Sequence, residues 1–245
     1  MIRMSMSRVL PVLLLAVLLT SCGRKYKIEG SSSVTSVDGK MLFLKVLRGE
    51  EWIVVDSAEV IHGIFEMGGP VDSAEMATLY MDQEGIMPLV LEKGKIEITI
   101  SNTQLTVKGT PLNDKLYGFI DKRNDLEEKI EELERKEARM VLDGGNLEEV
   151  RGQLKQEVDA FVKEMNDYVK QFITDNFENV LGPSVFMMMC STLPYPVMTP
   201  QIEDIMRTAP LTFKDNALVK KFLSDAKENM KLIEEQHRLL QNTVN

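Results

Sequence analysis

Two cysteines are the residues of this 245-residue sequence whose type could support thiol chemistry. Cys22 ends an apolar stretch near the start, and Cys190 lies alone in the apolar run 185–190. A thiol-disulfide oxidoreductase needs an attacking and a resolving thiol, and a Cys-x-x-Cys motif lowers the pKa of the first. Cys22 and Cys190 form no such motif. We therefore predict no redox centre and interpret Cys190 as a buried, unreactive thiol.

The residues before Cys22 predict a different role for that cysteine. Two arginines precede the apolar segment 9–19, which has the length of a secretory signal core and is shorter than the roughly 20 residues that span a bilayer. The ending Leu19-Thr20-Ser21-Cys22 resembles a bacterial lipobox. This resemblance implies a signal peptide over residues 1–21 and a lipid, such as palmitate, on Cys22. The alternatives are an ordinary signal peptide with a chance cysteine and a buried hydrophobic helix.

The charge of the chain argues against nucleic acid as a partner. Without residues 1–21, which contain two arginines, the chain has 27 Lys and Arg against 38 Asp and Glu, a formal net charge of −11. Phosphate neutralisation by Lys and Arg dominates nucleic-acid affinity, and basic clusters attach proteins to anionic lipid surfaces. The hydrophobic fraction of 44% is that of a globular protein with a buried core. We expect no nucleic-acid partner and no broad electrostatic contact with lipid.

The polar residues give no arrangement that would support catalysis. Ser57 and Ser73 each follow an aspartate, but neither lies in a Gly-x-Ser-x-Gly turn and neither histidine is placed to serve them. His62 and His237 are far apart in the sequence and have no cysteine nearby, which disfavours a zinc site. The two glutamate pairs within 127–132 are interpreted as solvated helix surface. We predict no catalytic residue, no metal site and no cofactor.

Glycine, tryptophan and methionine residues also receive structural interpretations. Segments 68–70 and 144–145 are interpreted as turns, because neither has the strand, loop and helix order of a phosphate-binding loop. Trp52, the only tryptophan, is predicted to lie in the core. Met187–Met189 could form a soft binding or metal-facing patch. Because three consecutive residues cannot share one helix face, we favour core packing with partial exposure.

Residues 26–108 have the pattern of short strands and turns. Ile96, Ile98 and Ile100 alternate with polar residues, which predicts a strand with one buried face, and His62-Gly63 predicts a hairpin turn. About eight short strands of this kind predict an antiparallel β-sandwich or open barrel. The predicted strands are 40–47, 52–56, 58–61, 64–67, 77–81, 87–91, 95–100 and 104–108.

After residue 109 the apolar spacing changes to that of helices. Thr110-Pro111 is a typical helix start, a hydroxyl N-cap followed by proline. Apolar residues then recur every seven positions on both sides of Gly144-Gly145. Two amphipathic helices around this break predict a helical hairpin from about Leu112 to Phe177. Further helices are predicted at 184–192, at 200–208 and from about 214 towards 242.

Together these patterns predict an α+β protein with a β-sandwich over residues 22–110 and an α-helical region over 111–245. The seven-residue repeat requires each hairpin helix to bury an apolar stripe. One possibility is that the two helices pack on each other, on the sandwich and on the last helix. The other is that the far end, residues 133–142 and 147–154, projects beyond the sandwich and binds a protein partner or a second copy.

Several segments of the strand region together resemble a known family. In order along the chain these are 26–30, 38–44, 55–60, 63–67, 88–94 and 107–114, the last with the sequence VKGTPLND. They resemble the family called domain of unknown function 4369, from about Tyr26 to Asp114 and more loosely to Lys227. The resemblance implies an N-terminal module of envelope lipoproteins that commonly precedes a thioredoxin-like thiol-disulfide oxidoreductase domain. The Gly-x-x-Ala-Pro segment and the Cys-x-x-Cys motif of that domain do not follow here.

These observations lead to two hypotheses about function. The first is a lipid-anchored cell-envelope protein that binds a partner or ligand without catalysis. Because residues 23–25 lack the acidic cluster that resembles a surface-export signal, we expect an outer-membrane lipoprotein that faces the periplasm. The second is an accessory or diverged relative of thiol-disulfide oxidoreductases that acts with a separate redox protein. The exposure of Cys190 distinguishes the two, because thiol chemistry needs an accessible thiol.

Overall fold

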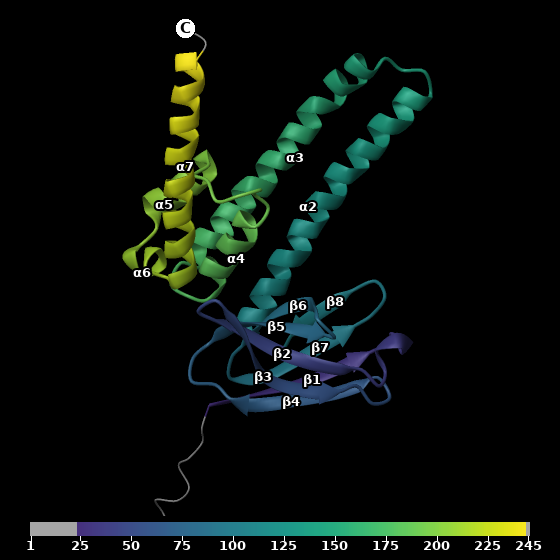
Figure 1. Cartoon of the computed structure of the whole chain (residues 1–245). Coiled ribbons are helices and arrows are strands. Elements are labelled where there is room, and N and C mark those ends of the chain that lie inside the picture. Colours follow the sequence, from purple (N-terminus) through teal and green to yellow (C-terminus); the bar gives the residue numbers. More distant parts are fainter. Residues whose placement is uncertain (1–23, 244–245) are drawn as a thin grey trace, which may run out of the picture.

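The structure, a computed structural model, describes residues 24–243, in which a β-sandwich carries a set of helices that rise from it (Figure 1). Within these residues eight strands form two four-stranded sheets, in the orders β4-β1-β7-β8 and β3-β2-β5-β6. Neighbouring strands are antiparallel except β1 and β7, which are parallel. The predicted α+β fold is confirmed. The strands are β1 (Lys25–Ser32), β2 (Met41–Arg48), β3 (Glu51–Glu59), β4 (Ile64–Pro70), β5 (Glu75–Met81), β6 (Glu84–Leu91), β7 (Gly94–Ile100) and β8 (Leu105–Lys108), with a short 3-10 helix η3 (Thr35–Val37) between β1 and β2.

Alternating side chains build the core of the sandwich. Ile96, Ile98 and Ile100 of β7 are buried, as their spacing predicts. The opposite face of the same sheet is charged, and Lys95 Nζ lies 2.8 Å from Glu29 Oε2 on β1. The first sheet therefore turns its isoleucines toward the second sheet and its ion pairs toward solvent.

β1 is the strand that the sequence pattern does not predict. It lies inside its sheet, between β4 and β7, and its inward positions Tyr26, Ile28 and Gly30 are all buried. The Phe65 ring of β4 fills the space beside Gly30, where an added Cβ would come within 2.0 Å of the ring. Because Gly30 takes an inward position, the alternation of apolar and polar residues that would predict β1 is interrupted, although the strand is buried.

The predicted strands 52–56 and 58–61 are a single strand, β3. This strand pairs with β2 along its length, with a register shift between Leu44 and Lys45 of β2. The predicted turn at His62-Gly63 is confirmed, since both residues have positive φ angles, 52° and 73°. The number of strands agrees with the prediction because the missed β1 offsets the division of β3.

The interpretation of residues 68–70 as a turn is wrong. These residues end β4 and pair with Lys25–Lys27 of β1. The backbone N–H of Gly68 donates to Asp56 Oδ2 of β3 at 2.8 Å, and the Tyr26 hydroxyl donates to the same oxygen at 3.2 Å. Asp56 thus connects the two sheets at one edge, and this connection requires extended backbone at Gly68.

Helices follow the sandwich in the order that the sequence predicts. The predicted hairpin is confirmed as α2 and α3, which project away from the sandwich (Figure 1). Gly144 in the connecting turn has a φ of 96°, and the side chain of Asn146 caps α3 by accepting from the N–H groups of Glu148 and Glu149. In the described residues the helices are α2 (Pro111–Leu142), α3 (Leu147–Asp175), α4 (Leu181–Cys190), α5 (Pro200–Thr208), α6 (Leu211–Lys214) and α7 (Ala217–Thr243).

The segment VKGTPLND forms a rigid joint between the sandwich and α2. The Asn113 side chain donates to the carbonyl of Val90 on β6 and accepts from the N–H of the same residue, both at 2.8 Å, and it also donates to Thr110 Oγ1 at 2.8 Å. Glu92 Oε1 accepts from the N–H of Leu112 at 2.7 Å, which satisfies a free donor in the first turn of the helix. These bonds fix the direction in which α2 leaves the sheet.

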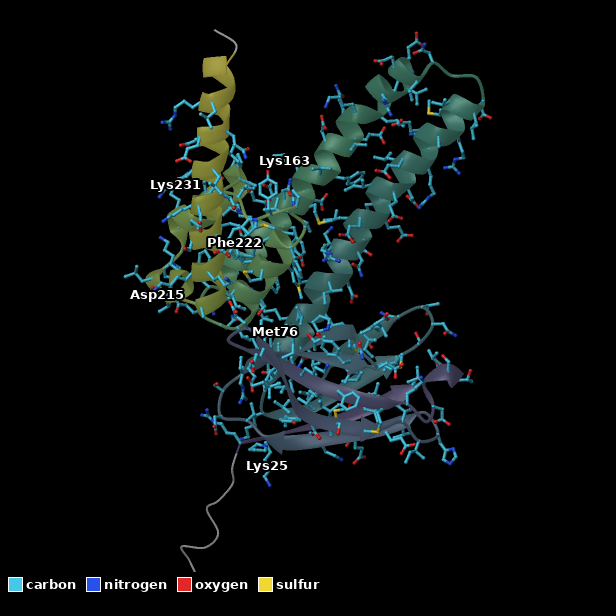
Figure 2. All side chains as sticks on the ribbon, in the orientation of Figure 1. Lys25, Met76, Lys163, Asp215, Phe222 and Lys231 are labelled. Carbon is cyan, nitrogen blue, oxygen red and sulfur yellow. The ribbon has the colours of Figure 1, made fainter. Side chains whose placement is uncertain are left out.

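One apolar core continues from the sandwich into the helices. Phe186 of α4 is fully buried and lies between Phe213 of α6 and Phe222 of α7, with both ring centroids at 5.6 Å. Figure 2 shows Phe222 turned inward from α7 and Met76 of β5 at the junction of sandwich and helices. The far end of the hairpin has a separate small apolar cluster around Leu154.

Candidate functional site

Of the two cysteines, the structure describes Cys190 but not Cys22. Cys22, the predicted lipidation site, lies outside the described residues. Cys190 at the end of α4 is 5% exposed, and burial raises the pKa of its thiol to about 12. The interpretation of Cys190 as a buried thiol is confirmed.

Trp52 does not lie in the core, and that prediction is wrong. The side chain is 49% exposed on β3, an edge strand of the second sheet. It contacts the Tyr80 ring edge-on, with ring centroids 5.7 Å apart. The neighbouring residues Ile53 and Val54 are also exposed. Because the run 52–55 contains no polar residue, its sequence does not show which face is buried.

The structure does not bring the predicted polar residues together. Ser57 is exposed on β3, Ser73 is exposed between β4 and β5, and His62 is exposed in its turn, while His237 belongs to α7. The glutamate pairs within 127–132 are exposed on α2, as expected. Across residues 24–243 no group of three or more His, Cys, Asp or Glu side chains is arranged to hold a metal ion.

The far end of the hairpin packs mainly on itself. Leu133 and Leu154 are 8% and 4% exposed and belong to one apolar cluster between the two helices. The exposed apolar residues near the turn are instead Leu142, at 86%, and Leu147, at 41%. The expected projection beyond the sandwich is present (Figure 1), but the repeat itself is covered within the hairpin.

A pocket at the base of the hairpin combines an apolar lining with several polar groups. It lies where α4 and α5 meet α2 and α3, and its volume is about 210 Å³. Met188 and Met189 form its α4 side and are half-buried, as predicted. Methionine side chains are flexible and polarisable, which suits a pocket that adapts to its ligand. The apolar lining residues are Phe119, Met165, Val169, Val185, Met188 and Met189.

Polar and charged residues also line this pocket. The lining includes Arg123, Glu127, Asn166, Thr192 and Gln201. Arg123 Nε is buried and makes no hydrogen bond within the described residues. It lies 3.3 Å from Glu127 Oε1, so the contact is an ion pair without hydrogen-bond geometry. The Arg123 side chain is 38% exposed and that of Glu127 is 50% exposed. The pocket lining thus combines six apolar residues with an arginine and four other polar or charged residues.

Arg123 is a pocket residue that the sequence analysis does not single out, although a signal for it exists. The apolar positions of α2 continue at alternating spacings of three and four, and Arg123 and Glu137 occupy two of these positions. Charged residues at such seam positions reduce stability unless they are paired. Glu137 is paired across the hairpin, because its Oε1 lies 3.0 Å from Arg151 Nε on α3. Among the described residues, the ion-pair partner of Arg123 is Glu127, on its own helix.

None of the helices within residues 24–243 combines the length and the apolar composition needed to cross a membrane.

Comparison with known proteins identifies one domain. Residues 26–116 match the family model described as Domain of unknown function (DUF4369). The match covers the sandwich, the joint and the start of α2, and it ends before the pocket. No curated protein matches the chain.

Proposed function

We propose a function from the pocket, which lies outside residues 26–116, because the description of the family model that matches those residues assigns no activity. The protein acts as a lipid-anchored, non-catalytic binding module of the cell envelope. Its ligand site is the methionine-lined pocket at the base of the hairpin. The rigid joint holds this pocket at a fixed position above the sandwich.

The observation that carries the proposal is the composition of the pocket. Six of its lining residues are apolar, and three of them are methionines. Ligand pockets are mostly apolar and have a few polar groups that fix orientation. An apolar cavity of about 150 Å³ engineered into another protein takes up benzene, so a pocket of about 210 Å³ has room for a somewhat larger apolar group.

The ionisable groups of the pocket favour binding over catalysis. Arg123 and Glu127 are its charged residues, and they pair with each other. Among the residues that the structure describes, the pocket lining includes no histidine and no cysteine. The alternative role beside thiol-disulfide oxidoreductases gains no support from Cys190, because a buried thiol with a raised pKa is a poor nucleophile at neutral pH.

The pocket is tested with 1-octanol, a neutral apolar probe. The full chain is placed in lipid nanodiscs, and the NMR signals of its ¹³C-labelled methionine methyl groups are the readout. The methyl signals of Met165, Met188 and Met189 should shift with the free probe concentration, whereas exposed Met41 on β2 should not respond. Met188→Trp should fill the pocket and abolish the shifts. Met187→Trp is the matched control, because Met187 is also half-buried but lies outside the pocket. Unchanged pocket signals at saturating octanol would exclude this site.

The anchor is tested separately. Lipid attachment contributes about 0.8 kcal/mol per buried methylene, so several acyl chains hold a protein firmly on a membrane. Cys22→Ser should leave the chain uncleaved or release it from membranes in fractionation. The proposed facing toward the periplasm predicts that protease treatment of intact cells leaves the protein intact. A wild-type chain that fractionates with the soluble proteins contradicts the anchor.

A further inference from the structure

Arg123 stands out among the charged residues of the hairpin. It occupies a seam position but has no partner on the opposite helix, whereas the second seam charge, Glu137, is bonded to Arg151 at 3.0 Å. Arg123 instead lines the pocket. A charge at a seam position carries a desolvation cost, and in the hairpin only the cost at Glu137 is offset by a cross-helix pair.

The guanidinium has donors to spare. An arginine carries five N–H donors in a planar fork that matches a carboxylate. Glu127 Oε1 lies 3.3 Å from Nε, without hydrogen-bond geometry. Within the described residues, no hydrogen bond from the Arg123 side chain to a protein acceptor is found. The outer edge of the fork is therefore free to bind an acceptor in the pocket.

The helix ends at the pocket do not oppose an anion. The C-terminal carbonyls of α4 would repel one, but those of Met188 and Met189 accept from the hydroxyl groups of Ser191 and Thr192, both at 2.8 Å. Gln201 in the first turn of α5 lines the pocket, so the positive end of that helix lies at its rim. Both arrangements favour a negative group beside Arg123.

From this geometry, and resting on the proposed function, we infer that the ligand of the pocket is a carboxylate with an apolar tail. The tail lies among Met165, Met188 and Met189, and the carboxylate binds the outer edge of the Arg123 guanidinium. Scaled from the benzene-sized cavity of about 150 Å³, the pocket has room for roughly eight carbon atoms. The ligand class is thus an acyl carboxylate of about the length of octanoate.

The experiment compares three probes with the same tail, namely octanoate, 1-octanol and octylammonium. Each is titrated at pH 7 into the full chain in nanodiscs, with the free concentration measured and the methyl signals of Met188 and Met189 as readout. Octanoate should bind about tenfold more tightly than the other two, because a charge-assisted bidentate pair is stronger than a neutral hydrogen bond. Arg123→Gln should remove this preference and leave the affinity for octanol within about twofold.

Arg135→Gln is the matched control, since Arg135 also pairs with a glutamate four residues away, Glu131 at 3.2 Å, but lies outside the pocket. It should keep the preference for octanoate. If Arg123→Gln does not fold, Arg123→Lys replaces it, and the preference should then fall by severalfold because the lysine lacks the fork.

The possible results separate the two proposals. Equal binding of octanoate and octanol by the wild-type chain, or an unchanged preference in the Arg123 variants, overturns the carboxylate inference and leaves the pocket as a binding site. Tighter binding of octylammonium also overturns it and assigns the polar contact to Glu127. Absence of binding by all three probes overturns the proposed function and the inference with it.

Discussion

At the scale of single residues, Asn113 shows how a short motif determines the architecture. Its side chain is 0% exposed and satisfies both backbone groups of Val90 while it also binds Thr110. Val90 lies near the end of β6 and would otherwise leave a buried N–H and a buried carbonyl unpaired. Asn113 therefore replaces a missing neighbouring strand at the point where the helix begins.

Replacing Asn113 with leucine should destabilise the protein strongly. The change keeps the approximate size but leaves the two backbone groups of Val90 unpaired, at about 1–3 kcal/mol each. We expect the free energy of unfolding in urea to fall by about 2–5 kcal/mol. Asn124→Leu on an exposed position of the same helix is the control and should change it by less than about 0.5 kcal/mol. Equal effects of the two variants would show that the joint contributes nothing specific.

Cys190 should make the stability depend on pH in the alkaline range. Burial raises the pKa of its thiol from 9.0 to about 12, so the folded chain holds this proton more tightly than the unfolded chain. Below about pH 9 both states are protonated and the group has no effect. As the pH rises from 9 towards 12, the unfolded chain ionises first, and stability falls by at most about 1.4 kcal/mol per pH unit.

The measurement uses a Cys22→Ser background, in which Cys190 is the one remaining thiol. Urea midpoints between pH 8 and pH 10.5 are compared with those of the Cys190→Ala variant. This variant lacks the Cys190 thiol but keeps the tyrosines and lysines, which also titrate in the alkaline range. The difference between the two curves should grow with pH. Parallel curves, or rapid reaction of the folded chain with a thiol reagent, would contradict the burial of Cys190.

At the scale of elements, the hairpin consists of a supported base and a self-contained end. The base packs on α4 and α5, whereas the end is held by the cluster of Leu133, Val150 and Leu154 and by the pair between Glu137 and Arg151. A small apolar cluster provides little stability. The end of the hairpin is therefore expected to open before the rest of the protein.

Leu154→Asp should unfold the end of the hairpin and leave the sandwich intact. Leu154 is 4% exposed, and replacing it with a charge removes about 2–5 kcal/mol of packing from a cluster that has few other members. Hydrogen exchange should show loss of protection in residues 130–160 with unchanged protection in β1 and β7. Val162→Asp, at a 41% exposed position of the same helix, is the control and should alter neither region. Global unfolding by Leu154→Asp would show that the hairpin end is coupled to the main core.

The sequence was sufficient for elements whose apolar period is regular. The alternating isoleucines correctly predicted β7, and the seven-residue repeat correctly predicted α2 and α3. In both cases the regular spacing of apolar residues is visible in the sequence itself. β1 was missed because its inward position 30 is a glycine, and the space beside it is filled by Phe65 of another strand. The local sequence of β1 does not show this contact. Trp52 was wrongly predicted to lie in the core, because β3 is an edge strand with apolar residues on both faces. Its sequence therefore has no apolar and polar alternation that would show which face is buried.

The candidate site was only partly accessible from the sequence for a related reason. Its walls come from four helices, and one of them, α4, is packed through Phe186 against Phe213 of α6 and Phe222 of α7. Arg123 was visible as a charge at a seam position. The sequence does not show that Glu137 pairs with Arg151 across the hairpin whereas Arg123 has no partner on the opposite helix, because this difference depends on the three-dimensional structure.

At the scale of the whole molecule, the question is whether sandwich and helices are independent. The sequence predicts a boundary at residues 110 and 111, where the period changes. The apolar core crosses this boundary, because Leu116, Tyr117 and Phe119 of α2 belong to the same cluster as the sandwich interior. The Tyr117 hydroxyl also donates to the carbonyl of Pro88 on β6 at 3.0 Å. The family match likewise extends past the boundary, to residue 116.

A fragment that ends at residue 110 therefore tests the two-domain prediction directly. It keeps all eight described strands but loses Asn113, Leu116 and Tyr117, so the end of β6 becomes exposed and the backbone groups of Val90 lose their buried partner. Burial of each large apolar side chain contributes about 1.5–3 kcal/mol, which is a large part of the stability of a small domain. We expect this fragment to be unfolded or several kcal/mol less stable than a fragment that ends at residue 122 and retains the joint. Urea unfolding followed by circular dichroism compares the two, and equal stability would mean that the sandwich is an independent domain whose helices are attached through the joint alone.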